Sequence, residues 1–167
     1  MLVVFGGLPA TGKTTIAREV AARLHATYLR IDTIEMALRS SRVADDIGPA
    51  GYVIGYALSE ANLRLGQTVV ADSVNPLAET RAAWCSVAAA AASPILEVEM
   101  VCSDSAEHRR RVETRTVDIP GLIPPTWAEV VAREYHPWPE PHLAIDTARV
   151  QPEDAVATVL AAIAARS

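Results

Sequence analysis

The sequence predicts an α/β fold in which a parallel sheet of five strands carries helices on both faces. Short continuous apolar runs alternate with longer segments whose apolar residues recur at helical spacing, as in parallel sheets covered by helices. Half of the residues are hydrophobic, enough for a buried core, which excludes a fibrous or disordered chain. The 167 residues show no repeat and no change of composition, so we expect residues 1–167 to form one domain.

Each expected strand is a short β-prone run. The first is continuous and apolar until Gly6 and Gly7 end it, which indicates a strand buried on both faces. The third ends at Asp72, and the weaker fifth at Asp146. In chain order, the expected strands cover residues 2–5, 27–31, 68–71, 95–102 and 143–145.

Capping residues mark the ends of the expected helices. Three pairs suit helix starts: Asp32 with Glu35, Asp104 with Glu107, and Thr126 with Glu129. Asn75-Pro76 suits an N-cap followed by proline at the first helical position, and Gly66 suits a helix stop. The expected helices cover residues 12–25, 32–40, 52–65, 75–92, 104–115, a short stretch from 126, and 151–166.

Two segments are expected to be irregular, residues 42–48 and residues 116–142. The second is long for a small domain, and long insertions of this kind are often functional. It contains Trp127, Tyr135 and Trp138, which we expect to pack there. His136 and His142 have no metal-ligand spacing, so we expect them at the surface.

Charge and cysteine content exclude several classes of function. Fifteen basic and 20 acidic residues give a net charge of −5, which argues against a general nucleic-acid binder. Cys85 and Cys102 form no disulfide framework and no metal-ligand spacing, and we expect two buried thiols in a reducing compartment. The weakly polar run 84–101 is too interrupted to span a membrane. The first residues lack the basic region of a signal peptide, and we expect a cytoplasmic protein.

Residues 7–14 match the Walker A pattern G-x-x-x-x-G-K-[ST]. Its glycines permit backbone angles that let the N–H groups of the loop converge on phosphate oxygens at the start of the next helix. Lys13 would reach the β- and γ-phosphates, and the Thr14 hydroxyl would hold Mg²⁺. The expected strand precedes the motif and the expected helix follows it, so the sequence predicts ATP or GTP binding.

Other positions narrow the kind of nucleotide-binding protein. Neither Asn62 nor Asn75 is followed by lysine, so the guanine-reading N-K-x-D motif of GTPases is absent. Asp72 ends the third strand and would serve Mg²⁺ through water or face the substrate. Ser73 follows it where motor ATPases carry a hydrolytic glutamate. With GTPases and motor ATPases excluded, the remaining class of nucleotide-binding protein is a small kinase.

Several motifs occur in the order found in one group of enzymes. They are GGLPATGKTT at 6–15, Arg30-Ile31-Asp32, VVADSVNP at 69–76, the basic run 109–115 and Ala144-Ile145-Asp146-Thr147. Together they cover nearly the whole chain. The sequence thus resembles the small P-loop kinases that include chloramphenicol phosphotransferase, zeta-toxin-like kinases and polynucleotide 5′-kinases, and it looks most like the AAA family ATPase chains of that group.

The resemblance implies a three-layer P-loop NTPase fold with a lid over about residues 109–142, ATP and Mg²⁺ as cofactors, and roles for particular side chains. Asp32 would accept or orient the proton of the acceptor hydroxyl. Arg115 would meet the transferring phosphate and Arg111 the nucleotide, while Asp146-Thr147 would close the nucleotide site. The residues expected to bind nucleotide are Gly7, Leu8, Pro9, Ala10, Thr11, Gly12, Lys13, Thr14, Thr15 and Arg111.

The acceptor-side candidates are Asn75, Tyr52 and Tyr56, each with a structural alternative. Asn75 could instead cap a helix, and the tyrosines, four residues apart, could instead pack in the core. The expected function is transfer of the γ-phosphate of ATP to a hydroxyl of a small molecule. Two alternatives stay open: a kinase of a nucleic-acid end, nucleoside or nucleotide-sugar, and a regulatory nucleotide-binding ATPase. The sequence leaves open the acceptor, the oligomeric state and the biological pathway. It also leaves open which lid arginine meets the adenine and which the phosphate.

Overall fold

The computed structural model describes residues 1–42, 46–138 and 141–166. Its centre is a five-stranded sheet in the order β2-β3-β1-β4-β5, with every neighbouring pair parallel. The strands are β1 (Leu2–Gly6), β2 (Thr27–Arg30), β3 (Val69–Asp72), β4 (Ile95–Val101) and β5 (Leu143–Asp146). The predicted fold class is therefore confirmed. Each strand starts and ends within one residue of its expected limits.

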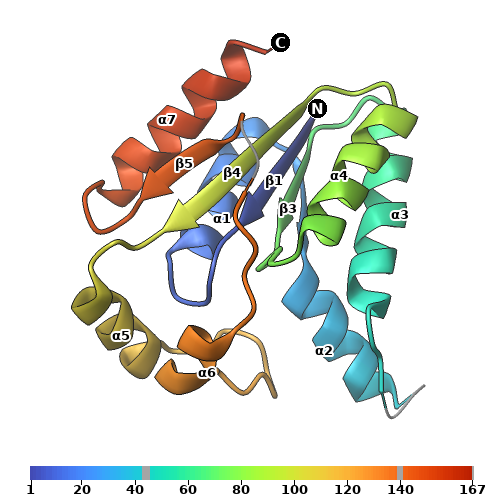
Figure 1. Ribbon diagram of the computed structural model, residues 1–167. Coiled ribbons are helices and arrows are strands. Elements are labelled where there is room, and N and C mark those ends of the chain that lie inside the picture. Colours follow the sequence, from blue (N-terminus) through green and yellow to red (C-terminus); the bar gives the residue numbers. More distant parts are fainter. Residues whose placement is uncertain (43–45, 139–140, 167) are drawn as a thin grey trace.

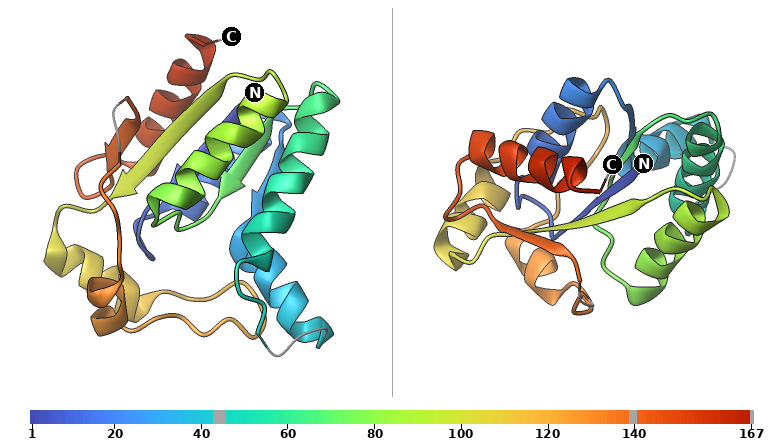
Figure 2. Two further views of the ribbon diagram at one scale, coloured as in Figure 1. Left: turned by 45° about the vertical axis from the view of Figure 1, so that its right-hand side comes forward. Right: turned by 90° about the horizontal axis from the view of Figure 1, so that it is seen from above.

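Helices cover both faces of this sheet (Figures 1 and 2). They are α1 (Lys13–Leu24), α2 (Ile31–Ser41), α3 (Ala50–Arg64), α4 (Ala78–Ala90), α5 (Ser105–Thr114), α6 (Trp127–Ala132) and α7 (Pro152–Ala164). None of the helices in the described part of the chain has the length and apolar content needed to cross a membrane. The irregular stretch expected over 42–48 includes residues 43–45, which lie outside the described residues.

The core forms two layers because β1 contributes side chains to both faces. Val3 and Phe5 pack with α1 and α7 on one side, whereas Leu2 and Val4 pack with α3 and α4 on the other. Side chains alternate along a strand, so a strand buried on both sides must be apolar throughout. This explains why the central run has no polar residue.

β4 departs from that pattern, because only one of its faces is apolar. Its other face carries Glu97 and Glu99, and Glu99 accepts a hydrogen bond from the Tyr135 hydroxyl at 3.1 Å and contacts His142 Nε2 at 3.1 Å. The chain between α6 and β5 thus covers this face. His142 is nearly buried there, so the expectation of a surface histidine is wrong for this residue.

Trp138 anchors the same covering segment. Its ring lies against Gly6, where an added Cβ would come within 2.3 Å of the ring carbon Cζ2. The Arg81 guanidinium lies 5.1 Å from the ring centroid, and the indole N–H donates to the Tyr135 hydroxyl at 2.7 Å. The predicted packing role of Trp138 and Tyr135 is confirmed.

Two of the expected helix starts are wrong. α2 begins at Ile31, so Asp32 lies in the first turn and forms no capping box with Glu35. Ile31 is buried, and that burial places the first helical residue directly after the strand. α4 begins at Ala78 rather than after Asn75, which adopts a left-handed φ of 51° and is fully buried.

Other caps form as expected. The Asp104 carboxylate accepts from the backbone N–H groups of Ala106 and Glu107, Thr126 and Glu129 form a capping box, and Pro152 begins α7. The expectation of buried thiols is wrong, since Cys85 is exposed and Cys102 only half-buried. In α4 the neighbouring Trp84 takes the buried position.

Candidate active site

A cleft of about 1070 Å³ lies where the strands end, beside the loop between β1 and α1. Its walls come from α1, α2, the connection between β3 and α4, and the chain that links α5 to α6. Figure 2 (left) shows that this link, residues 115–126, extends from α5 towards α2 and returns to α6. Ligand sites of open parallel sheets lie at this edge.

The loop of residues 7–12, which we call the phosphate loop, has the positive φ angles at its glycines that the motif predicts. Gly7 and Gly12 have φ of 140° and 89°. A Cβ at Gly7 would lie 2.2 Å from the Met100 carbonyl oxygen, so no side chain fits there. Gly12 is the N-cap of α1, and no side chain caps that helix. The N–H groups at the start of α1 therefore have no side-chain partner and could donate to an anion.

Most of the predicted nucleotide-binding residues reach the cleft. Those that line it are Pro9, Ala10, Gly12, Lys13, Thr14, Thr15 and Arg111. Gly7, Leu8 and Thr11 shape the loop instead: the Leu8 carbonyl accepts from the Thr11 hydroxyl at 2.9 Å and from Lys13 Nζ at 3.2 Å. Burial lowers the pKa of Lys13, and the carboxylates of Asp72 and Asp32 oppose that shift.

Arg30 is the main site residue to which the sequence assigned no role. Its side chain is only 3% exposed, and its guanidinium meets three carboxylates. Nη1 lies 2.9 Å from Asp118, Nη2 lies 3.3 Å from Asp32, and Nε lies 3.9 Å from Asp72. Asp118 also pairs with Arg18 of α1. The pairing of Arg30 with Asp118 spans 88 positions, so no sequence pattern could indicate it.

The two predicted carboxylates occupy different environments. Asp32 is partly exposed and lines the cleft. Asp72 is buried behind the lining and accepts from the Tyr28 hydroxyl at 2.7 Å. Burial, and then the charge of Asp72, raises the pKa of Tyr28. Asp32 is therefore the carboxylate that a ligand can contact directly.

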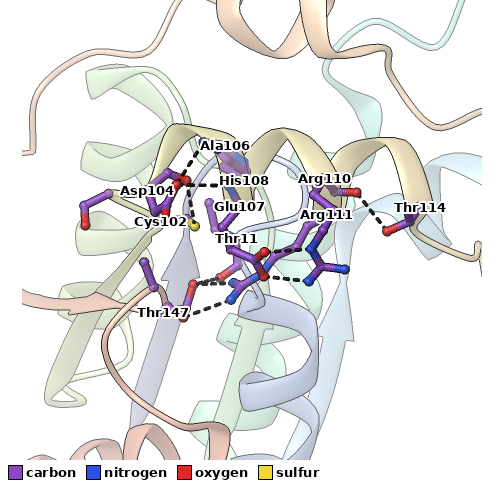
Figure 3. Close-up of polar contacts among 12 residues, drawn as sticks. Thr11, Cys102, Asp104, Ala106, Glu107, His108, Arg110, Arg111, Thr114 and Thr147 are labelled. Carbon is purple, nitrogen blue, oxygen red and sulfur yellow. Dashed lines mark hydrogen bonds and ion pairs between the residues drawn. The ribbon is translucent and has the colours of Figure 1, made fainter.

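The two predicted arginines both line the cleft, but they differ in their contacts. Arg111 donates from Nη1 to the Thr147 hydroxyl at 2.9 Å and from Nη2 to the Thr147 carbonyl at 3.0 Å, while its Nε pairs with Glu107 (Figure 3). Arg115 follows the last residue of α5. Within the described ranges it has no hydrogen bond or ion pair, so its charge is available to a ligand.

Arg111 and Thr147 also border a second, smaller cavity of about 390 Å³. This cavity adjoins the phosphate loop at Gly12 and is otherwise formed mainly by the start of α7 and the turn after β5. The Thr147 hydroxyl lies 2.9 Å from the Thr11 carbonyl, to which it donates. The end of β5 is thus joined to the phosphate loop.

The three acceptor-side candidates lie in different places, and only one of them lines the cleft. Tyr52 lines the cleft, and its hydroxyl accepts from the Asn75 backbone N–H at 3.0 Å. Tyr56 packs in the core instead, edge-on to Trp84 with ring centroids 4.5 Å apart. Asn75 is buried outside the cleft lining, and its side-chain amide has no partner among the described residues.

Glu35 is a further cleft residue that the sequence did not assign to the site. It lies three positions after Asp32 on α2, so both carboxylates occupy one side of the helix. Burial, and then the charge of Asp32, raises the pKa of Glu35. The expected cap would have satisfied this side chain locally, whereas the observed helix start leaves it facing the cleft.

The donor set fits a magnesium ion that is bound mainly by phosphate and water. No cluster of three or more His, Cys, Asp or Glu residues in the described part of the chain could hold a metal ion. Thr14 lines the cleft, and Asp72 supplies the nearby buried carboxylate. Mg²⁺ commonly takes one or two protein oxygens and completes its shell with substrate phosphates and water.

A family model described as an AAA domain matches residues 2–120. The chain belongs to the AAA domain family. The search of curated proteins found no match to this AAA-domain protein.

Solved structures share the whole fold of this AAA-domain protein. A provisionally named kinase from Chloroflexus aurantiacus has a TM-score of 0.78 at 20% identity, over 99% of this chain and 97% of that one. Kti12 from Chaetomium thermophilum, in complex with ADP-AlF3, has a TM-score of 0.67 at 22% identity, over 98% and 99%. The APS kinase CysC from Mycobacterium tuberculosis, in complex with AMPPNP and APS, has a TM-score of 0.65 at 23% identity, over 95% and 94%. The family match confirms the predicted AAA group, and these structures confirm the predicted fold.

Proposed function

We propose that this protein transfers the γ-phosphate of ATP to a hydroxyl group of a small molecule. One observation carries the proposal: the phosphate loop, the Asp32 carboxylate and the Arg115 guanidinium all line one cleft. Phosphoryl transfer needs a phosphate cradle, a group that orients the acceptor, and positive charge for the transition state. These parts lie far apart in the sequence and come together at the ends of the strands.

The nucleotide would extend from the cleft into the smaller cavity. The loop amides and Lys13 would bind the triphosphate, and the cavity beside Arg111 and Thr147 would take the nucleoside. Gly12 and Thr15 line both spaces, which supports one continuous ligand. Two of the similar structures hold nucleotide analogues, AMPPNP in the APS kinase and ADP-AlF3 in Kti12.

The chemical step breaks the bond between the γ-phosphorus and its bridging oxygen to ADP, and forms a bond to the acceptor oxygen. The acceptor hydroxyl gives its proton to Asp32, the carboxylate that lines the cleft. Arg115 balances the charge that spreads over the transferring oxygens. Thr14 and Asp72 would hold Mg²⁺, which when bound would neutralise part of the charge of the phosphates.

The charges on the acceptor side favour a small molecule over a nucleic-acid end. Asp118 pairs with both Arg30 and Arg18, and Asp32 and Glu35 add two further carboxylates to the same wall. A groove that follows a phosphodiester backbone needs an excess of exposed cations. Among these described residues three carboxylates face two arginines, so the wall beside Asp32 carries no such excess.

Product formation tests the proposal directly. The purified protein is incubated with Mg-ATP and pools of hydroxyl metabolites, and ADP release and phosphorylated products are measured. Stimulated ADP release should disappear in Lys13→Ala. In Asp32→Asn transfer should be lost while Mg-AMPPNP still binds. Slow ATP hydrolysis that no hydroxyl compound stimulates, together with a stable protein complex, would instead support the regulatory ATPase alternative.

A further inference from the structure

His108 is a buried side chain that contacts the phosphate loop from outside the motif. It lies on α5 with only 6% of its surface exposed. Its Nε2 lies 2.8 Å from the carbonyl oxygen of Pro9, 99 residues earlier in the chain. Figure 3 shows His108 on the turn of α5 that faces the loop.

The contact fixes both the tautomer and the direction of the carbonyl. A carbonyl oxygen can only accept, so Nε2 of His108 must carry the proton. Proline has no N–H, and the carbonyl is therefore the only polar backbone group at Pro9. Turned towards α5, this oxygen is kept away from the anion that the neighbouring N–H groups would bind.

Other carbonyls of the loop are held in the same way. Leu8 O accepts from Thr11 and Lys13, and Thr11 O accepts from Thr147. The first two donors belong to the motif, and Thr147 follows β5. His108 is the donor that comes from α5, which makes that helix part of the support for the loop.

The ring of His108 is held in turn by α6. The Trp127 ring meets it edge-on, with centroids 5.2 Å apart. Trp127 is the first residue of α6, whose start is fixed by the Thr126 and Glu129 capping box. Movement of α6 would therefore free the ring that holds the Pro9 carbonyl.

We propose that His108 is a positioning residue that couples the docking of α6 to the shape of the phosphate loop. The inference rests on the proposed nucleotide binding and adds a residue outside the motif. When α6 is docked, His108 holds the Pro9 carbonyl outward and the loop N–H groups are preorganised for phosphate. When α6 leaves, the loop loses this support and nucleotide affinity falls.

Two amide variants separate the hydrogen bond from the rest of the side chain. Glutamine places its side-chain N–H close to the position of Nε2, whereas asparagine is too short to reach Pro9. We expect His108→Asn to weaken Mg-AMPPNP binding roughly tenfold, the effect of one unsatisfied buried carbonyl, and His108→Gln to stay within about threefold of the wild type. Arg109→Gln, an exposed change on the same helix, is the control. Titration calorimetry gives the affinities, and circular dichroism confirms folding.

Hydrogen exchange at the backbone amides of Ala10 and Thr11 tests the coupling to α6. Exchange should become faster in both His108→Asn and Trp127→Leu. Equal affinities in His108→Asn and the wild type, or no difference between the Asn and Gln variants, would overturn the positioning role. Unchanged exchange in Trp127→Leu would overturn the coupling. Absence of Mg-AMPPNP binding to the wild type would instead refute the proposed function.

Discussion

Replacing Asp118 with asparagine should lower the free energy of unfolding, because the ion pairs of Asp118 with Arg30 and Arg18 are lost. Arg30 and Arg18 lower the pKa of this carboxyl from 3.8 to about 2. One pKa unit corresponds to about 1.4 kcal/mol, so complete pairing would contribute about 2 kcal/mol. The carboxylate is 42% exposed, and screening by water reduces this to about 1 kcal/mol. Arg30 keeps Asp32 and Asp72 as partners, so the larger penalty of an unpaired buried charge does not arise.

The contribution of Asp118 to stability should depend on pH, in a direction that follows from its pKa shift. The folded-state pKa of Asp118 lies below its unfolded value, so the contribution is complete above about pH 4 and is lost as the pH falls towards about 2. Urea unfolding of the wild type and Asp118→Asn should therefore differ by about 1 kcal/mol at pH 7, or about 2–4 °C in melting temperature. The difference should shrink steadily below pH 4.

Glu113→Gln is the matched control, because among the described residues this glutamate pairs only with exposed Arg109. The loss of unfolding free energy in Glu113→Gln should stay within about 0.5 kcal/mol. If Asp118→Asn costs no more than this control, the pairing with Arg30 contributes nothing to stability. A loss above about 3 kcal/mol would show that Arg30 depends on Asp118 alone.

Three further substitutions test the site and the fold. Arg115→Ala should lower kcat on the order of 100-fold or more and change the Kd of Mg-AMPPNP less than about threefold; the opposite split in steady-state kinetics and calorimetry would make Arg115 a nucleotide anchor. Trp138→Ala should cost about 3–5 kcal/mol in urea unfolding, because the ring covers Gly6 and Arg81, and a loss below about 1 kcal/mol would disprove this packing role. Asp104→Ala should cost about 1 kcal/mol in thermal unfolding, because two N–H groups lose their acceptor, and an unchanged stability would mean that the cap does not form in solution.

The parts of the site that could be predicted are those encoded within a few residues. The Walker A pattern specifies the glycines, Lys13 and Thr14 because the loop conformation is local. The strand-end positions of Asp32 and Asp72 followed from the parallel sheet, since the strands of such a sheet end at one edge. The wrong helix starts at Asp32 and Asn75 arose because burial, rather than capping, determined where those helices begin.

The sequence by itself determined the parallel sheet, its two-sided core and the phosphate loop, because periodicity and glycine positions act over short distances. Tertiary structure alone decided which side chains meet. Arg30 pairs with Asp118, His108 reaches Pro9, and Arg111 binds Thr147, each across at least 36 positions. Such pairings depend on how distant elements pack around the ends of the strands. The residue type at either position does not indicate which residue it will contact.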